Sequence, residues 1–277
     1  MKTIKVKCPA KINLSLKVLG KRPDGFHDIE SVMQAINLYD YLTVSVEPSE
    51  KLEIELSGTS DKIPYDEKNL VWRAAVLFFE KAGMGQNFKV TAFIEKNIPV
   101  EAGLAGGSTD GAGMLYALNE LFEKPLTREG LHELCAKLGS DLNFCLEGGR
   151  KMTTGRGEKL QNIPFEEFSV SLVKPMNFGI SAKEAYTKFS AKKELNALGQ
   201  EDFVNDLEWA VIEDYPELQK IKQAYPNALM SGSGPTYYAV GTDFSADGNF
   251  PGGDLTDGDF IIINGLKSIP DGVGVVE

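Results

Sequence analysis

The stretch that decides the fold is Lys96–Phe122, KNIPVEAGLAGGSTDGAGMLYALNELF. Its first half is rich in glycine and ends on the polar side chains of Ser108, Thr109 and Asp110. Its second half places apolar residues at the i, i+1, i+4, i+7, i+8 spacing of a buried helix face. We therefore predict that a glycine-rich loop leads directly into a helix. Ser108 or Thr109 would cap this helix by accepting a hydrogen bond from a free backbone N–H.

This junction of loop and helix favours an anion, and phosphate is the obvious candidate. Glycines let the backbone approach a ligand closely, and the free N–H groups and dipole of a helix N-terminus favour negative charge. The loop is not a Walker loop, because no lysine precedes Ser108, and its glycines do not have the G-x-G-x-x-G spacing of a dinucleotide loop. The alternative is a tight strand-to-helix turn in which the glycines serve packing. Glycine content alone does not decide between the two.

Composition restricts the class of protein. The chain has 277 residues, enough for one large domain or two of ordinary size. Its net charge of −11 argues against a nucleic-acid or anionic-membrane partner, so a nucleotide site would need a local concentration of positive charge. No apolar run approaches the roughly 18 residues of a membrane span, and no signal region is visible. Three cysteines without metal-type spacing indicate a reduced compartment, the cytoplasm.

Periodicity predicts most of the secondary structure. Short strands are expected over residues 4–7 and 14–18, with Cys8–Asn13 as the segment between them. Residues 42–46 and 52–56 alternate in the same way and are expected to be antiparallel strands. Helical patterns cover residues 69–81, 127–139, 182–189, 203–212 and 216–225. A second glycine-rich turn, Ser231–Gly234, leads into a strand, and residues 260–264 are expected to form the last strand.

Several residues have an ordinary structural interpretation beside a functional one. Lys11 is flanked by apolar residues near a strand end, where a lysine usually extends along the surface to solvent. Phe26 would pack in the core, and His27 would lie on the surface. His132 lies off the apolar stripe of its helix and is expected in solvent. Asp141 follows a helix end, where an acidic residue commonly caps the next helix.

Four motifs, in this order, resemble those of the GHMP kinases, the superfamily of galactokinase, homoserine kinase, mevalonate kinase and phosphomevalonate kinase. They are CPAKINLSL from residue 8, IPVEAGLAGGSTDGAG from residue 98, LGSDLNFCLEGG from residue 138 and MSGSGPTYYAV from residue 230. The resemblance spans about residues 4–240. Within the superfamily, the block Pro9–Asp40 and the NDLE segment at Asn205–Glu208 resemble kinases of a cytidine diphosphate-linked methylerythritol.

The resemblance implies a two-domain α+β fold with ATP and substrate in the cleft between the domains. Residues 1–160 would form the ribosomal-protein-like N-terminal domain, and residues 161–277 the ferredoxin-like C-terminal domain. The stretch 245–259, SADGNFPGGDLTDGD, has no helical pattern where the family has a helix. This leaves open an abbreviated second domain after residue 241.

The resemblance also implies the activity. With Mg²⁺, the γ-phosphoryl group of ATP would pass to the 2-hydroxyl of the methylerythritol moiety, a step of non-mevalonate isoprenoid precursor biosynthesis. Lys11 and Asp141 match the catalytic pair, and Ser108 is the expected protein ligand of Mg²⁺. The residues that match the loop around the ATP phosphates are Pro99, Val100, Glu101, Ala102, Gly103, Leu104, Ala105, Gly106, Gly107, Ser108 and Thr109.

Further matches concern the alcohol substrate. Asn13 and His27 match substrate contacts, with His27 at the cytosine edge. Phe26 and Tyr186 match the aromatic residues that sandwich the cytosine ring. The residues that match the glycine turn on the substrate side are Gly232 and Gly234.

The chemistry of the matched pair is consistent with kinase activity. A hydroxyl is a poor nucleophile until its proton leaves, so a carboxylate within reach helps as a general base. A lysine beside that carboxylate favours its ionised form and steadies developing charge. The remaining contribution in phosphoryl transfer is positioning and charge neutralisation.

The sequence departs from the family pattern at several places in the site, among them Ser181-Ala182, where many relatives have Ser-Thr at a substrate contact. Ala105 stands where the family usually has glycine, and it needs either a negative φ or some backbone strain. Phe26 replaces the usual tyrosine and lacks its hydroxyl. Asp141 is followed by Leu142 and Asn143 instead of Val-Pro.

These departures leave two alternatives to the predicted kinase. One is a nucleotide-binding relative that has lost turnover, and the other is a kinase of a different small alcohol. In every case we expect a small-molecule partner, neither nucleic acid nor membrane, and a monomer or weak homodimer.

Overall fold

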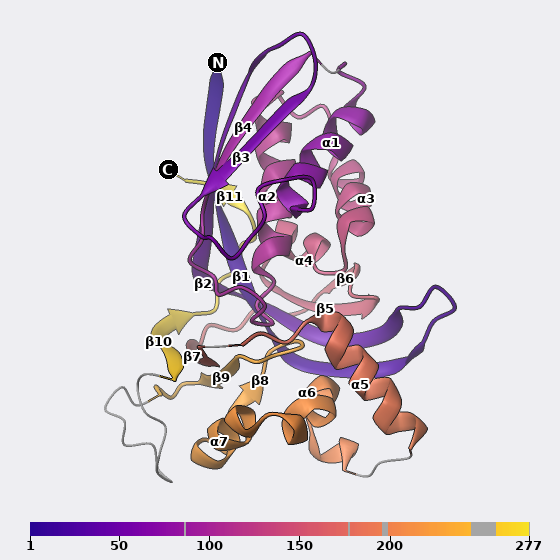
Figure 1. The fold of residues 1–277 in the computed structure, drawn as a ribbon, viewed down its shortest axis with the longest axis vertical. Helices are drawn as coiled ribbons and strands as arrows, with labels where there is room; N and C mark the ends of the chain where they lie inside the picture. The colour runs from indigo at the N-terminus through magenta and orange to yellow at the C-terminus, as the bar shows by residue number, and fades with distance from the viewer. Residues whose placement is uncertain (86, 177, 196–198, 245–258, 277) are drawn as a thin grey trace.

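The computed structural model describes residues 1–85, 87–176, 178–195, 199–244 and 259–276, which form two β-sheets with helices packed against them (Figure 1). The larger sheet has the order β11-β1-β2-β4-β3, with β5 paired to β2 and β6 to β5. Its strands are β1 (Lys2–Lys21), β2 (His27–Pro48), β3 (Glu53–Gly58), β4 (Phe88–Glu95), β5 (Arg150–Gly155), β6 (Lys159–Asn162) and β11 (Gly274–Val275). The smaller sheet has the order β10-β7-β9-β8, and its strands are β7 (Ser169–Pro175), β8 (Leu229–Met230), β9 (Tyr237–Val240) and β10 (Phe260–Lys267).

The long hairpin of β1 and β2 runs through both halves of the molecule (Figure 1). Cys8–Asn13 was expected to separate two short strands, but it lies inside the single strand β1. Three register shifts, at Pro9/Ala10, Asn13/Ser15 and Val18/Gly20, interrupt the regular pairing with β2. Such irregularities bend a strand and reverse which side chains face inward. The alternation of apolar residues is therefore lost in the middle of β1 although the strand continues.

Strand β3 lies at one edge of the larger sheet and pairs with β4 in parallel, not with β2. The expectation of antiparallel pairing for residues 52–56 is therefore wrong. Helix α1 (Leu70–Ala82) connects β3 to β4, and a crossover helix of this kind returns the chain in the same direction. Alternation in the sequence identifies a half-buried strand but not its neighbour.

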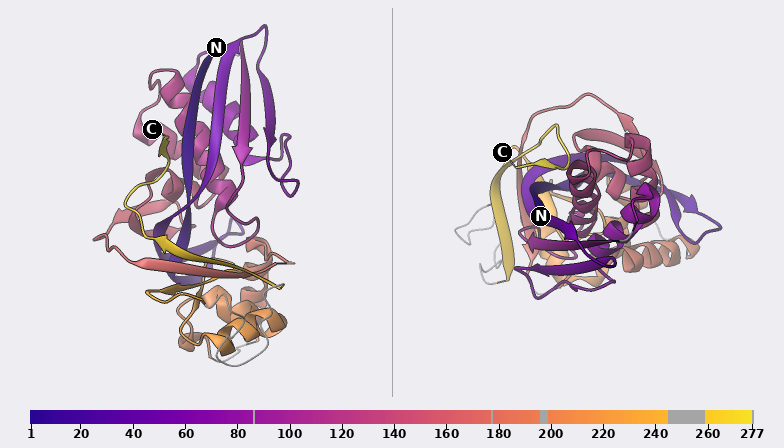
Figure 2. Two further views of the ribbon diagram at one scale, coloured as in Figure 1. Left: turned by 90° about the vertical axis from the view of Figure 1, so that its left-hand side faces the viewer. Right: turned by 90° about the horizontal axis from the view of Figure 1, so that it is seen from above.

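The first four helices pack together on one face of the larger sheet (Figure 2). They are α1, α2 (Gly106–Leu121), α3 (Arg128–Leu138) and α4 (Leu142–Glu147). The predicted starts of α1 and α3 are confirmed: Asn69 accepts a hydrogen bond from the N–H of Val71, and Thr127 accepts one from the N–H of Gly130. His132 of α3 was expected in solvent, but its Nε2 lies 2.8 Å from Glu147 Oε1 and its side chain is largely buried.

The second group of helices packs with the smaller sheet and with the lower end of the long hairpin. These helices are α5 (Ala182–Glu194), α6 (Asp206–Val211) and α7 (Pro216–Ala224), with single turns of 3₁₀ helix at Gln200–Asp202 and Ile212–Asp214. Leu16, Val18 and Ile29 of the hairpin share this core. The apolar side chains of β1 and β2 thus tie the two groups of helices together.

The chain does not end on β10, contrary to expectation. After β10 it returns to the larger sheet, where β11 pairs with β1 at Val6 and Lys7. The predicted boundary at residue 160 stays a prediction, and residues 245–258, which are most of the stretch without a helical pattern, lie outside the described residues. Within the part of the chain that the structure describes, no helix combines the length and apolar character needed to cross a membrane.

Candidate active site

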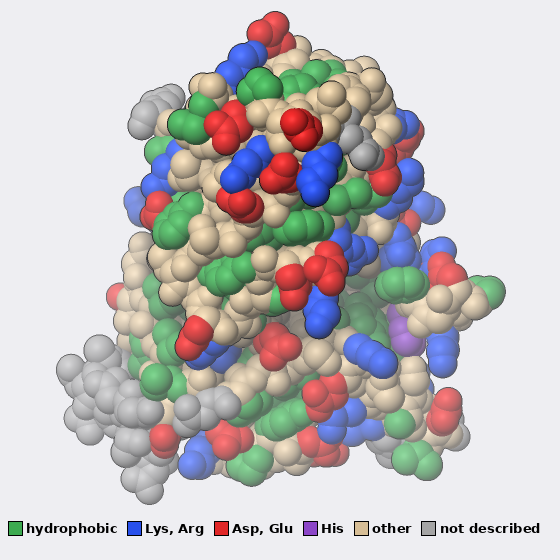
Figure 3. All heavy atoms as spheres, turned by 45° about the horizontal axis from the view of Figure 1, so that its top comes forward, with side chains coloured by type: hydrophobic (Ala, Val, Ile, Leu, Met, Phe, Trp, Pro, Cys, Tyr) green, Lys and Arg blue, Asp and Glu red, His purple; other side chains and the backbone are tan. Residues whose placement is uncertain are grey.

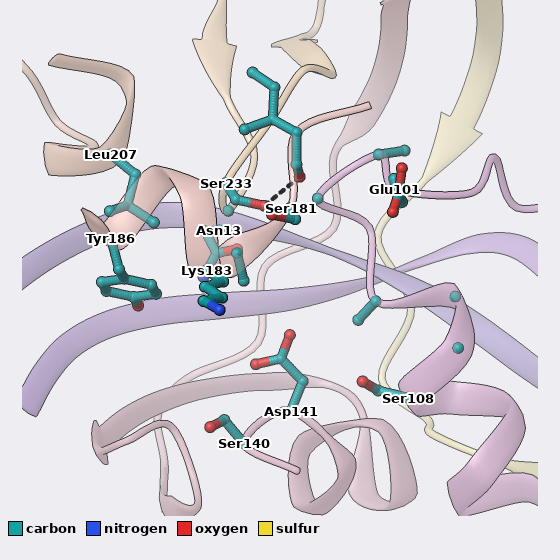
Figure 4. A pocket seen from close by; sticks show the side chains of 18 of the residues that line it. Asn13, Glu101, Ser108, Ser140, Asp141, Ser181, Lys183, Tyr186, Leu207 and Ser233 are labelled. Carbon is teal, nitrogen blue, oxygen red and sulfur yellow. Dashed lines mark hydrogen bonds between the residues drawn. The ribbon is translucent and has the colours of Figure 1, made fainter. Parts of the chain in front are cut away.

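A cavity of about 1070 Å³ lies between the glycine-rich loop, the long hairpin and helix α5 (Figure 4). Six basic side chains line it, against four acidic ones, although the whole chain has a net charge of −11. The basic residues are Lys11, Lys21, Lys68, Lys96, Arg156 and Lys183. Figure 3 shows Lys and Arg side chains and a histidine gathered beside the hollow on this face. Positive charge is therefore concentrated at the cavity, as a nucleotide site in an acidic protein requires.

The helix that follows the glycine-rich loop starts at an earlier residue than predicted. Helix α2 begins at Gly106, Ala105 occupies the N-cap position, and no side chain caps the helix. The prediction that Ser108 or Thr109 is the cap is therefore wrong: both lie within the helix, because the two glycines before them already have helical conformation. Ala105 has a φ of 61°, a left-handed conformation that costs an L-residue roughly 1–2 kcal/mol. Of the two expectations for Ala105, backbone strain is confirmed.

Lys11 is almost completely buried, so the surface interpretation of this residue is wrong. Its Nζ donates to Asn13 Oδ1 at 2.6 Å and to the Gly103 carbonyl at 2.9 Å, and it lies 3.7 Å from Asp141 Oδ2. Its backbone N–H donates to the Leu104 carbonyl at 3.1 Å. Lys11 and Asn13 share one face of β1 because they are two residues apart. The fold thus brings the predicted pair, Lys11 and Asp141, together beside the glycine-rich loop.

Asp141 occupies the N-cap position of α4, but its side chain makes no capping hydrogen bond. The carboxylate instead points into the cavity, where it is about one quarter exposed (Figure 4). The capping interpretation is therefore wrong for this side chain. A carboxylate that is free of a structural bond and beside a buried ammonium group is available for proton transfer.

Ser108 also directs its hydroxyl into the cavity, close to the helix start (Figure 4). Among the described residues, no cluster of three His, Cys, Asp or Glu side chains could hold a metal ion. Mg²⁺ usually keeps several waters and takes one or two protein oxygens together with substrate phosphates. The oxygen donors Ser108 and Asp141 fit that mode of binding.

At the other end of the cavity lie the aromatic residues. The Phe26 ring is 49% exposed on the loop between β1 and β2, so its predicted place in the core is wrong. The Arg156 guanidinium lies 4.6 Å from the centre of this ring. His27 stacks on Tyr186, with ring centres 5.0 Å apart, and its Nε2 lies 3.0 Å from Ser190 Oγ. Burial and the charge of Lys21 lower the pKa of His27, which favours the neutral imidazole at pH 7.

The two glycine-rich segments touch each other. Gly232 and Gly234 have positive φ values of 56° and 80°. A Cβ at Gly232 would lie 3.0 Å from Lys11 Nζ, and a Cβ at Gly103 would collide with the Ser231 carbonyl oxygen. Only glycine allows this approach, so the second turn closes the cavity directly against Lys11 and the first loop.

Two features of the cavity were missed in the sequence. Lys96 Nζ forms ion pairs with both Asp40 and Asp110, the latter at 2.9 Å, beneath the glycine-rich loop. Burial raises the pKa of Asp110 to about 7, and Lys96 opposes that shift. Arg156 lies in a turn between two glycines, which carries no sign of a cavity residue. Both features depend on contacts between segments far apart in the chain.

Comparison with known proteins agrees with this description. Residues 69–149 match the family model of the GHMP kinase N-terminal domain. The homoserine kinase of Cytophaga hutchinsonii superposes with a TM-score of 0.72 over 100% of this chain and 98% of that one; at 18% identity this shows a shared fold. The class defined by the fold and the cavity is therefore that of the GHMP kinases, which use ATP.

Relatives with higher sequence identity show which group of GHMP kinases the chain resembles. Proteins of Carboxydothermus hydrogenoformans and Bacillus pumilus, both named 4-diphosphocytidyl-2-C-methyl-D-erythritol kinase, are 40% and 41% identical over 84% of this chain and 86% of their own. A crystal structure of 4-(cytidine 5'-diphospho)-2C-methyl-D-erythritol kinase has a TM-score of 0.71 and 28% identity, over 96% of this chain and 100% of that one. The chain belongs to the GHMP kinase family, in the group of 4-diphosphocytidyl-2-C-methyl-D-erythritol kinases.

Proposed function

We propose that this protein transfers the γ-phosphoryl group of ATP to the 2-hydroxyl of 4-diphosphocytidyl-2-C-methyl-D-erythritol. The observation that carries the proposal is the Lys11–Asp141 pair, 3.7 Å apart, between the glycine-rich loop and the aromatic residues. The relatives that share about 40% identity with this chain act on that substrate, as their names state. One end of the cavity thus suits the phosphates of ATP, and the other suits a cytosine base.

In the proposed reaction Asp141 accepts the proton of the 2-hydroxyl while the hydroxyl oxygen attacks the γ-phosphorus. The bond from that phosphorus to the bridging oxygen breaks, and ADP leaves. Lys11 orients the carboxylate and stabilises negative charge that develops on the transferred group. Mg²⁺, held by the ATP phosphates and Ser108, would neutralise phosphate charge. The backbone of Pro99–Thr109 and the start of α2 would surround the phosphates.

On the alcohol side, we propose that the cytosine ring binds between Phe26 and Tyr186 and that His27 reads its polar edge. Support comes from the exposed ring of Phe26 and from the position of His27, which already lies against Tyr186. Aromatic faces contribute roughly 1–3 kcal/mol per stacked base. Asn13 and the turn containing Gly232 and Gly234 would hold the methylerythritol beside Lys11.

The proposal is tested by measuring ADP release with ATP alone, with 4-diphosphocytidyl-2-C-methyl-D-erythritol, and with a panel of other small alcohols. We expect release that depends on the cytidine-linked substrate, and a product carrying phosphate on its 2-oxygen. ADP release with another alcohol alone would identify a kinase of different specificity. ATP binding without release in any mixture would identify a relative that has lost turnover.

We expect Gly107→Val to raise the KM for ATP by about tenfold or more and to leave the fold intact. Gly107 is exposed at the start of α2, and the nearest atom to an added Cβ is Leu70 Cδ1 at 4.0 Å, so the side chain would project into the space for the phosphates. Gly106 is a poorer choice, because its Cβ would lie 2.7 Å from Lys96 Nζ and disturb the protein itself. Gly130→Val, in the first turn of α3, is the matched control. An unchanged KM for ATP in folded Gly107→Val would contradict the phosphate assignment.

We expect His27→Ala to reduce discrimination between the cytidine substrate and its uridine analogue. A site that hydrogen-bonds a polar edge rejects analogues that lack the matching group, and His27 is the imidazole at this end of the cavity. The measurement is the ratio of kcat/KM for the two analogues at pH 7 to 8. His132→Ala changes the chain's other histidine, outside the cavity, and should leave this ratio unchanged. Equal use of both analogues by the unaltered protein would contradict the cytidine assignment.

We propose the cytoplasm as the location, because Cys8, Cys135 and Cys145 are all buried thiols without a disulfide. Association as a monomer or weak homodimer stays a prediction. Sedimentation at several protein concentrations would test it.

A further inference from the structure

The NDLE segment, which the proposed chemistry does not use, holds the second glycine-rich turn. Asn205 is 1% exposed, and its Nδ2 donates to the carbonyl oxygens of Met230 and Gly232, both at 2.8 Å. Its Oδ1 accepts from the N–H of Leu207 at 2.9 Å, which caps helix α6. The amide group and the amide oxygen of this buried side chain are therefore engaged: one bond reaches the turn at Gly232, and a second reaches Met230, the residue directly before the turn.

The start of α6 is also joined to strand β1. Asp206, 1% exposed, accepts from the N–H of Val18 at 2.8 Å and from Lys17 Nζ at 3.1 Å. The N–H of Leu16 donates to the Val204 carbonyl at 3.1 Å. The residues that precede and open α6 thus bind the strand that carries Lys11 and Asn13 as well as the turn that faces them.

The turn itself lies beside the proposed catalytic lysine. Ser231 Oγ accepts from the N–H of Asn13 at 3.3 Å and donates to the Gly103 carbonyl, which also accepts from Lys11 Nζ. A Cβ at Gly232 would lie 3.0 Å from Lys11 Nζ and 3.3 Å from Asn13 Oδ1. The turn and Lys11 therefore share the Gly103 carbonyl, the space between Gly232 and Lys11 has no room for a side chain, and the amide of Asn205 helps to set where the turn lies.

We propose that Asn205 is a positioning residue for the alcohol side of the site: it holds the Ser231–Gly234 turn against Lys11 through two hydrogen bonds. Asn205 does not line the cavity and acts through the turn. Leu207 and Ser233, on either side of these bonds, line the cavity (Figure 4). The inference depends on the proposed function in one respect: the proposed function names the alcohol that is used in the test.

The test is Asn205→Asp, which keeps the size of the side chain and the acceptor for Leu207 but presents a carboxylate oxygen to two carbonyl oxygens. Loss of a buried donor leaves its partners unsatisfied, and we expect kcat/KM for the alcohol to fall roughly 10- to 100-fold. The Kd for a non-hydrolysable ATP analogue should change less than about threefold, because the hydrogen bond from the turn to the phosphate loop is made at Gly103, ahead of the helix start at Gly106. Lowering the pH should raise the activity of this variant relative to the unaltered protein, since a protonated carboxyl can again donate to one carbonyl. A residue with a merely structural role would change the unfolding temperature with pH and leave the alcohol kinetics of the folded protein unchanged.

Asn119→Asp is the matched control. Asn119 is also a buried amide that ties down a loop, since it donates to the Leu126 carbonyl and accepts from the Leu126 N–H, but it does not line the cavity. This control should lose stability and keep kcat/KM for the alcohol. Equal losses in both variants, or normal alcohol kinetics in folded Asn205→Asp, would overturn the inference.

If Asn205→Asp does not fold, Asn205→Ser keeps a capping oxygen for α6 and removes the double donor. This variant should also lose kcat/KM for the alcohol while its Kd for the ATP analogue stays nearly unchanged. If folded Asn205→Ser keeps normal kcat/KM for the alcohol, the inference is overturned. Failure of the proposed function is a separate result. It would appear as no turnover and no calorimetric binding of 4-diphosphocytidyl-2-C-methyl-D-erythritol by the unaltered protein, and the Asn205 comparison would then use the alcohol found in the substrate panel.

Discussion

Asp141→Asn is expected to lower kcat by roughly 10²- to 10⁴-fold and to leave ATP binding largely intact. The amide has the size of the carboxylate but cannot accept the proton of the alcohol. Because the Asp141 side chain makes no capping bond, the replacement removes no structural hydrogen bond of α4. The variant should therefore keep α4, and the stability that it loses should come from the buried Lys11 ammonium, which no longer has a carboxylate at 3.7 Å. Single-turnover measurements of product formation, together with the Kd for ATP, separate the chemical step from binding.

The control for this variant is Asp214→Asn. Asp214 pairs with Lys188 at 2.6 Å on the surface, outside the cavity, so the same atoms change without contact with substrate. Its kcat should stay within about twofold of the unaltered protein, as is usual for an exposed pair. Near-normal turnover of folded Asp141→Asn would contradict the base assignment.

Lys11→Met is expected to lower kcat by roughly 10²- to 10³-fold, the usual cost of removing one donor that stabilises charge in a transition state. Methionine keeps an unbranched chain of similar length but removes the ammonium group. The variant also leaves Asn13 Oδ1 and the Gly103 carbonyl without this donor, so a loss of stability of about 1–3 kcal/mol is expected. Activity must therefore be measured well below the unfolding temperature of the variant.

The double variant Lys11→Met/Asp141→Asn tests the mechanism more directly than either single variant. Residues that act as a unit are strongly non-additive, so the double variant should lose much less than the product of the two single losses. Lys188→Met, which changes the surface partner of Asp214, is the control for loss of a lysine in an ion pair. Fully multiplicative losses in the double variant would show that Lys11 and Asp141 act independently, and would contradict the proposed mechanism.

The sequence alone determined the features that depend on local chemistry. Apolar helical patterns predicted where α1 and α3 start, next to Asn69 and Thr127, and glycines before another such pattern predicted the loop that enters α2. The motifs were sufficient to predict the family, because they keep their order along most of the chain. These features follow from residues that are close together in the chain, so they need no knowledge of distant partners.

Only the tertiary structure decided which strands pair and which polar groups are buried. Alternation in residues 52–56 did not reveal the parallel partner β4, and three register shifts hid the continuity of β1. The sequence around Lys11 is typical of a surface lysine, but in the fold Lys11 is buried against the Gly103 carbonyl and the Asp141 carboxylate. Lys96 and Asn205 likewise find their partners on segments far away in the chain. A buried polar group is stabilised by partners that the fold supplies, and so its role cannot be inferred from its neighbours in the sequence.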